Sequence, residues 1–244
     1  MENDYQDIKN AQNYADFLDS TNGQIQQKIL LKAILKSLSP SPESVLLDAA
    51  CGTGWLAAEL KNTFPKTYAC DSSKTLIDLA KHRHSAVEFS HADILTQLPY
   101  PDGFFDSIIL NMAAPDLNNL SLAVKNLTLK LKMGGNLIIT APNPYLTFPV
   151  AVWKRSLLDV LLFRKPNIKI FDNHFKSKPI SREFNGKKID SNFYTLTDYF
   201  TAATNSCLNL INFIELKSQT DSPRFDLNYQ MFRYPLILLM DFKK

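Results

Sequence analysis

The hydrophobic and polar positions of this chain follow two alternating patterns. Short apolar runs typical of buried strands are followed by longer segments in which apolar residues recur every three to four positions, as on one helix face. The predicted strands lie at residues 44–48, 66–70, 86–89, 104–110 and 136–140. The predicted helices lie at residues 24–38, 55–62, 74–83 and 120–132, the last closed by the pair Gly134-Gly135 as a helix stop. Strands that alternate with helices predict a parallel sheet joined by helical crossovers.

The pattern changes after Pro142. Residues 143–192 are rich in proline, aromatic residues and lysine and show weak periodicity, so we interpret them as a basic, aromatic cap insertion. Beyond them, residues 196–207 predict a helix, and residues 210–216 and 234–240 predict two strands. The segment between these two strands is too short and too polar to predict a crossover helix. Because parallel neighbours need such a crossover, its absence would favour antiparallel pairing of the two strands.

These elements together predict an α/β fold with a doubly wound, mostly parallel seven-stranded sheet, an antiparallel terminal strand and the cap insertion after the fifth strand. We expect residues 1–244 to form a single domain that begins with an N-terminal helical segment at residues 1–40. In a sheet of this kind, the ligand binds at the carboxyl ends of the strands where the strand order reverses.

The composition narrows the class of protein. The chain has 244 residues, 45% of them hydrophobic and 21% charged, which is typical of a globular protein. Its start, Met-Glu-Asn-Asp, lacks the basic and apolar parts of a signal peptide, and no apolar run approaches the roughly 18 residues of a membrane span. Three widely spaced cysteines form neither a disulfide framework nor a zinc pattern. We therefore expect a cytoplasmic protein without a metal site.

The charge is concentrated in one segment. The net charge is +3, which is too small to indicate a polyanionic partner. Residues 151–190, however, hold ten Lys and Arg residues against four Asp and Glu residues, a local charge of +6. This segment therefore carries the basic character of the whole chain.

The candidate chemistry lies at the ends of the first three strands. Gly52 and Gly54 form a turn between a strand and a helix, where a ligand can approach the backbone closely. Asp48 precedes this turn, and Asp71 and Asp93 follow the next two strands. The glycine spacing also fits the dinucleotide fingerprint, but Asp48 would repel a diphosphate and favour an ammonium group. Three carboxylates at neighbouring strand ends suit a ligand with a ribose, an adenine and a cationic group.

Five segments, in order along the chain, resemble motifs of the class I S-adenosylmethionine-dependent methyltransferases, in the branch of small single-domain enzymes that act on small molecules. They are VLLDAACGTG at residues 45–54, CDSS at 70–73, ADI at 92–94, LPYPDGFFD at 98–106 and LKMGGNL at 131–137. Ala50 departs from the family pattern, in which glycine is usual; alanine is the smallest replacement, so we expect binding to survive. The rest of the chain, residues 143–244, resembles the family only loosely.

The resemblance implies that S-adenosylmethionine is the cofactor and S-adenosylhomocysteine the product. It implies that Asp48 holds the methionyl amino group directly or through water, Asp71 binds the ribose hydroxyls and Asp93 accepts from the adenine amino group. The full set of implied cofactor-binding residues is Tyr14, Asp48, Ala50, Cys51, Gly52, Gly54, Asp71, Ser72, Ala92, Asp93, Ile94, Asn111 and Met112.

The acceptor and the catalytic base stay open at this stage. A base is needed only where the acceptor starts protonated at a hydroxyl or a carbon, and the candidates are His174, Tyr145 and Tyr194. The apolar and basic cap favours a small-molecule acceptor with apolar bulk or acidic groups over a nucleic acid, with contact to a membrane surface as a further alternative. The alternative functions are a tRNA-modifying methyltransferase, an NAD-dependent oxidoreductase and a catalytically silent methyltransferase-like binding module.

Overall fold

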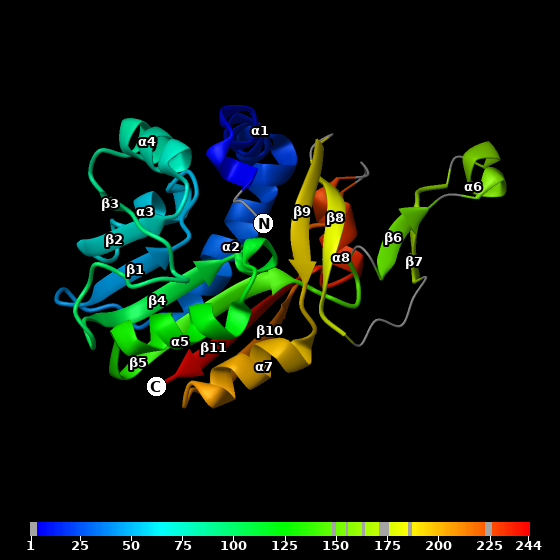
Figure 1. The fold of residues 1–244 in the computed structure, drawn as a ribbon. Helices are drawn as coiled ribbons and strands as arrows, with labels where there is room; N and C mark the ends of the chain where they lie inside the picture. Colours follow the sequence, from blue (N-terminus) through cyan, green and yellow to red (C-terminus); the bar gives the residue numbers. More distant parts are fainter. Residues whose placement is uncertain are drawn as a thin grey trace.

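A seven-stranded sheet forms the centre of the molecule in the computed structural model, which describes residues 4–147, 150–154, 156–162, 164–170, 176–184, 187–222 and 226–244 (Figure 1). In spatial order the strands are β10 (Asn209–Leu216), β11 (Ile237–Lys243), β5 (Leu131–Pro142), β4 (Phe105–Asn111), β1 (Val45–Ala49), β2 (Lys66–Asp71) and β3 (Glu88–His91). Strands β1 to β5 pair in parallel, whereas β11 runs antiparallel to both of its neighbours. The predicted fold class and the antiparallel terminal pair are confirmed.

Alternate residues of the central strands pack on opposite faces of the sheet. In β4, Ile108 and Leu110 belong to one core cluster, and Ile109 between them belongs to the other. Because successive side chains of a strand point to opposite faces, continuous apolar runs are the pattern that a sheet covered on both sides requires. These central strands are therefore held rigidly from both faces.

Helices cover both faces of the sheet. α5 (Leu120–Lys130) and α7 (Leu196–Asn205) pack on one face. α2 (Thr21–Ser37), α3 (Trp55–Leu60), α4 (Lys74–Arg83) and the short α8 (Leu227–Arg233) pack on the other. The N-terminal turn η1 (Asp4–Gln6) and helix α1 (Ile8–Asp19) lie at the carboxyl ends of the parallel strands (Figure 1).

The segment after β5 contains two small antiparallel ribbons. The first pairs β6 (Ala151–Lys154) with β7 (Asn167–Ile170), and α6 (Leu157–Leu161) lies between these strands. The second pairs β8 (Lys178–Phe184) with β9 (Lys187–Phe193). Figure 1 shows the first ribbon projecting from the body with α6 at its tip. The η2 turn (Ala114–Asp116) after β4 contacts β9.

The predicted end of one helix was wrong. Helix α5 ends at Lys130, and Leu131 already pairs with Phe105, so the pair Gly134-Gly135 is not the helix stop. The carbonyls of Leu129 and Lys130 accept hydrogen bonds from the backbone of Gly103 and Phe104, and these tertiary contacts end the helix early. The segment between the last two strands, which we interpreted as short and polar for a crossover helix, contains the short helix α8, and the two strands pair antiparallel as predicted. In the part of the chain that the structure describes, no helix is long and apolar enough to cross a membrane.

Candidate functional site

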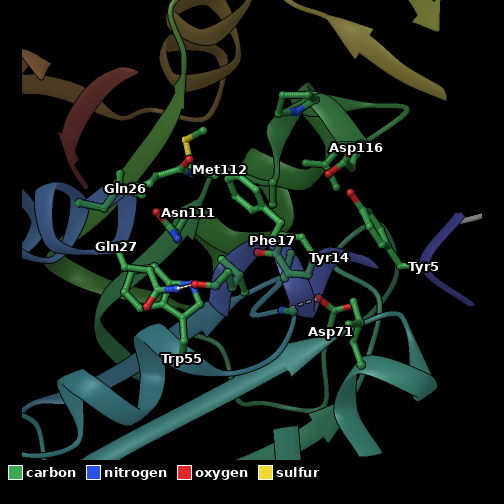
Figure 2. A pocket seen from close by; sticks show the side chains of 18 of the residues that line it. Tyr5, Tyr14, Phe17, Gln26, Gln27, Trp55, Asp71, Asn111, Met112 and Asp116 are labelled. Atoms are coloured by element: carbon green, nitrogen blue, oxygen red, sulfur yellow. Dashed lines mark hydrogen bonds between the residues drawn. The ribbon is translucent and has the colours of Figure 1, made fainter. Parts of the chain in front are cut away.

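A cavity of about 250 Å³ lies at the carboxyl ends of the parallel strands, next to the point where the strand order reverses between β1 and β4 (Figure 2). Its wall comes from the loops that follow β1, β2, β4 and β5 and from the N-terminal helices. The predicted residues on this wall are Tyr14, Ala50, Gly52, Asp71, Ser72, Asn111 and Met112. We call it the first cavity.

The glycine loop between β1 and α3 has a left-handed backbone at alternate positions. Ala50, Gly52 and Gly54 have φ angles of 54°, 56° and 76°. This conformation is free of cost for glycine but strained for alanine by about 1–2 kcal/mol, so Ala50 is held there by its surroundings. The loop is fixed to β2 because the Cys51 N–H donates to the carbonyl of Cys70 across 2.9 Å. The structure therefore supplies a conformational reason for glycine at the position of Ala50.

Asp71 is the carboxylate that faces the first cavity from the end of β2. Its Oδ2 accepts from the backbone N–H of Gly52 and its Oδ1 from that of Ser73, each across 2.8 Å. Burial raises the pKa of Asp71 above its ordinary value, the two backbone donors oppose the rise, and the charge of Asp116 adds to it. Each carboxylate oxygen retains capacity to accept a further hydrogen bond from a ligand.

Asp48 is buried behind the glycine loop, outside the wall of the first cavity. Its Oδ2 accepts from the backbone N–H of Ala57 across 3.1 Å, which satisfies a free donor in the first turn of α3. Burial raises the pKa of Asp48 to about 8, the Ala57 hydrogen bond acts against the rise, and the charge of Asp71 adds to it. The Asp48 carboxylate thus bonds to the helix that follows the loop.

The N-terminal segment covers the first cavity. A Cβ placed at Gly52 would lie 2.9 Å from Cε1 of Tyr14, so the tyrosine ring lies directly over the loop. Burial, followed by the charges of Tyr5 and nearby carboxylates, holds the pKa of Tyr14 well above its ordinary value. The segment is joined to the end of β2 because Gln6 donates to the Ser72 carbonyl and Ser73 Oγ donates to the Tyr5 carbonyl, each across 2.6 Å.

A second cavity of about 550 Å³ adjoins the first. Ala92 and Asp93, which follow β3, lie on its wall, and Asp93 Oδ1 accepts from the N–H of Leu95 across 2.8 Å. The two cavities share four wall residues, Tyr5, Ser72, Asp116 and Leu117. The strand ends therefore present one continuous series of polar groups from Asp93 past Asp71 to Asn111.

Four of the predicted cofactor-binding residues lie off the walls of both cavities: Asp48, Cys51, Gly54 and Ile94. Cys51 and Ile94 are buried in the core clusters. At Gly54, a Cβ would lie 2.6 Å from the Phe89 ring and 3.2 Å from Cβ of Ala80. Glycine at this position is thus required for close packing of the loop on β3 and α4, in addition to its left-handed backbone.

Two of the three candidate bases, Tyr145 and Tyr194, lie in the described part of the chain. The Tyr194 hydroxyl donates to the carbonyl of Leu117 across 2.8 Å, and Tyr145 is held by its N–H to Oδ1 of Asn143. Neither residue lies on the wall of the two cavities. His174 lies outside the described residues. Among the described residues, no cluster of His, Cys, Asp and Glu side chains has the arrangement of a metal site.

Several wall residues were missed by the sequence analysis. Gln26 and Trp55 line the first cavity from α2 and α3, and Phe17 lines it from α1 (Figure 2). Asp116 lies between the two cavities and accepts from the Ser191 hydroxyl across 3.3 Å. Its position five residues after the end of β4, at the same sheet edge as the other carboxylates, was the signal that could have identified it.

Comparison with known proteins identifies the segment that builds this site. Residues 47–139 match the model of a family described as a methyltransferase domain. Over 132 residues the chain is 30% identical to a malonyl-[acyl-carrier protein] O-methyltransferase of Buchnera aphidicola, a match that covers 54% of this chain and 51% of that protein. Over 111 residues it is 32% identical to a demethylmenaquinone methyltransferase of Beutenbergia cavernae, covering 44% of this chain and 45% of that protein. The chain thus matches about half the length of these curated relatives.

Most of the fold has a solved counterpart. The crystal structure of an S-adenosylmethionine dependent methyltransferase from Mesorhizobium loti superposes with a TM-score of 0.72 over 87% of this chain and 96% of that chain. The sequence identity is 17%, so this likeness concerns the fold. A match over 87% of this chain extends the likeness in fold well beyond residues 47–139.

Proposed function

We propose that this chain, a member of the class I S-adenosylmethionine-dependent methyltransferases, transfers a methyl group from S-adenosylmethionine to a small-molecule acceptor. The observation that carries the proposal is the pair of adjoining cavities at the carboxyl ends of the parallel strands, with Asp71 and Asp93 on their walls. This is the position at which doubly wound sheets bind nucleotide-like ligands.

The residues present fit S-adenosylmethionine. Asp71 can accept the two ribose hydroxyls on lone pairs that its backbone donors leave free. The second cavity, with Ala92 and Asp93 on its wall, would hold the adenine. The first cavity, floored by Ala50 and Gly52, would hold the methionyl part, with Asn111 and Met112 beside it.

For Asp48, this proposal keeps only the water-mediated form of the role that the resemblance implies. Because its carboxylate lies behind the loop and bonds to Ala57, we assign it to holding α3 against the glycine loop, with any contact to the methionyl ammonium passing through water. The charge of an ammonium nearby would favour its ionised form.

Bound S-adenosylmethionine supplies a sulfonium methyl that is already activated for displacement. The protein's task is then to align the acceptor and to exclude water, and orientation of this kind can supply about 7–11 kcal/mol. Phe17, Leu30 and Met112 give the first cavity apolar wall area, and Gln26 adds an amide. This wall supports an acceptor with apolar bulk and a polar group near the site of transfer.

The test is to measure S-adenosylhomocysteine formation with purified protein and a panel of acceptors. The panel begins with malonyl-acyl-carrier protein and demethylmenaquinone, the acceptors for which the two curated relatives are named, and includes bulk tRNA as a separate arm. We expect turnover with a small-molecule arm and a strong reduction of it in Asp71→Asn at subsaturating S-adenosylmethionine. Methylation of tRNA alone would select the tRNA-modifying alternative, and tight binding with no turnover in any arm would favour the silent binding module.

A further inference from the structure

Four leucines are exposed together at the end of the β6–β7 ribbon. Leu157, Leu158, Leu161 and Leu162, which we call the leucine tip, expose 77%, 57%, 66% and 51% of their surface. They lie on or directly after the single turn of α6 that Figure 1 shows farthest from the body. Isolated exposed leucines are ordinary, but an exposed cluster of apolar side chains marks an interaction site.

The ribbon that carries the leucine tip is fixed to the body at its base. The Trp153 ring packs against the rings of Tyr229 and Tyr234, with centroid separations of 6.4 and 5.6 Å. Just before β7, Lys165 Nζ donates to the carbonyl of Ser222 across 3.0 Å and lies 4.1 Å from the Tyr229 ring centroid. Trp153 and Lys165 thus anchor the ribbon to the body, and the four leucines are left for another surface.

The shape of the tip is fixed locally. The Asp159 N–H donates to Ser156 Oγ across 3.1 Å, and Asp159 Oδ2 accepts from the Ser156 N–H across 2.9 Å. These reciprocal hydrogen bonds cap the start of the helix. They also engage the carboxylate of Asp159, the acidic side chain of the tip. The Leu162 N–H then donates to the Leu158 carbonyl across 2.9 Å, which continues the turn through the last of the four leucines.

Exposed basic side chains lie on the same ribbon as the leucine tip. Arg164 and Lys169 are exposed on the return side of the ribbon, and Lys154 is exposed on the outgoing strand. These residues belong to the segment 151–190, which holds ten Lys and Arg residues against four Asp and Glu residues. An apolar projection with a basic border is the arrangement that binds the interface of an anionic bilayer, where leucines enter the headgroup boundary and basic groups meet lipid phosphates.

We propose that the leucine tip docks this protein on the surface of a bilayer that contains anionic phospholipid. The tip projects, so it fits a deformable interface better than it fits a rigid partner. Figure 1 shows that β4 and β5 point toward the side of the molecule on which the ribbon stands, the side of the two cavities. Docking therefore turns the side of the two cavities toward the bilayer. The inference stands on the ribbon alone and does not depend on methyl transfer.

The experiment is flotation of the full chain with vesicles of phosphatidylcholine alone and of phosphatidylcholine with phosphatidylglycerol. The tip variant replaces Leu157, Leu158, Leu161 and Leu162 with Gln. The matched control replaces four exposed apolar residues elsewhere, Leu122, Leu129, Met133 and Ile211, with Gln. A charge variant carries Arg164→Gln and Lys169→Gln. Thermal unfolding of each variant verifies folding.

We expect at least tenfold stronger partitioning to the anionic vesicles than to the neutral ones. The tip variant should lose that binding by about tenfold or more, the matched control should keep it, and the charge variant should lose about fivefold for each basic group. Absence of wild-type binding to anionic vesicles overturns the proposal. Equal binding of the wild type and the tip variant also overturns it, in favour of a purely electrostatic partner such as an acidic protein. Light scattering that shows a wild-type dimer and a monomeric tip variant overturns it in favour of self-association.

Discussion

The backbone N–H of Gly52 donates to Oδ2 of Asp71 across 2.8 Å, which joins the loop after β1 to the end of β2. The same carboxylate accepts from the Ser73 N–H at the start of α4. One side chain therefore fixes the relative positions of two loops and faces the cavity between them. A ligand diol that binds this carboxylate would therefore meet an acceptor that the two backbone N–H groups have already oriented.

Replacement of Asp71 by Asn should weaken S-adenosylhomocysteine binding by about 10- to 100-fold. A charge-assisted hydrogen bond contributes about 1.5–3 kcal/mol, and the amide provides one acceptor oxygen where the carboxylate provides two. Isothermal titration of the wild type and the variant measures the change. The matched control is Asp78→Asn, an exposed carboxylate of α4 paired with Lys74, which should leave the affinity unchanged. Equal affinity in Asp71→Asn would remove the ribose role of this residue.

Gly52→Ala should cost more stability than Gly103→Ala. Both glycines have a positive φ, 56° and 65°, so both substitutions carry the left-handed penalty of about 1–2 kcal/mol. At Gly103 the added Cβ meets nothing within 4 Å, whereas at Gly52 it meets the Tyr14 ring at 2.9 Å. The clash should therefore add about 1–3 kcal/mol to the loss in the free energy of unfolding that Gly52→Ala causes.

Urea unfolding in the Tyr14→Ala background isolates that clash. With the ring removed, the cost of Gly52→Ala should fall to that of Gly103→Ala. A cost that is the same in both backgrounds would show that the tyrosine ring does not press on the loop.

Asp48 should make the protein less stable as the pH rises from about 4 to about 8. Its folded pKa of about 8 lies above the ordinary aspartate value of 3.8, so in this window the folded state retains a proton that the unfolded state has lost. Stability then falls with pH, by at most about 1.4 kcal/mol per pH unit from this one group. Asp71 has a pKa shifted in the same direction and adds to the trend.

The difference between the wild type and Asp48→Asn separates this effect from other titrating groups. The amide can still accept from the Ala57 N–H, so the variant should gain stability over the wild type as the pH rises. His84, whose pKa is lowered mainly by burial, titrates with the opposite sign in both proteins and cancels in the difference. Urea unfolding at pH 5, 6.5 and 8 gives the result, and a constant difference across the three values would refute the assignment.

Ala50→Gly should be neutral or stabilising by up to about 1 kcal/mol. Glycine relieves the left-handed strain at a φ of 54° and increases the entropy of the unfolded chain, and the two effects partly cancel. Cys207, with a φ of 58° at an exposed position far along the chain, offers a matched comparison in Cys207→Gly. S-adenosylhomocysteine affinity should be unchanged in Ala50→Gly. A destabilisation above 1 kcal/mol would mean that the Ala50 methyl group makes contacts worth more than the strain.

The sequence pattern predicted the parts of this molecule that depend on local order. Strand, loop and helix follow one another from Val45 to Leu60, and the next strand ends at Asp71. Because the carboxyl ends of parallel strands meet at one sheet edge, the sequence predicted that Gly52 and Asp71 lie at the same edge. The helix end at Lys130 could not, because hydrogen bonds from Gly103 and Phe104 decide it.

The same distinction holds for the site. Phe17 and Gln26 reach the first cavity from the N-terminal helices. The sequence of these helices shows which face is apolar, but it does not show which strand ends that face covers. The ribbons β6–β7 and β8–β9 were missed because they form outside the seven-stranded sheet, and the periodicity of the segment is correspondingly weak. Contacts between distant segments, rather than local propensity, account for each of these omissions.

The most direct test of the account is a thermal shift of the purified protein with S-adenosylmethionine, S-adenosylhomocysteine and NAD side by side, in the wild type and in Asp71→Asn. A ligand at 100 times its dissociation constant stabilises the folded state by about 2.7 kcal/mol. We predict a rise in the melting temperature with the first two ligands in the wild type, a much smaller rise in Asp71→Asn and none with NAD. A rise with NAD alone, or equal rises in the two proteins, would contradict the proposed cofactor site.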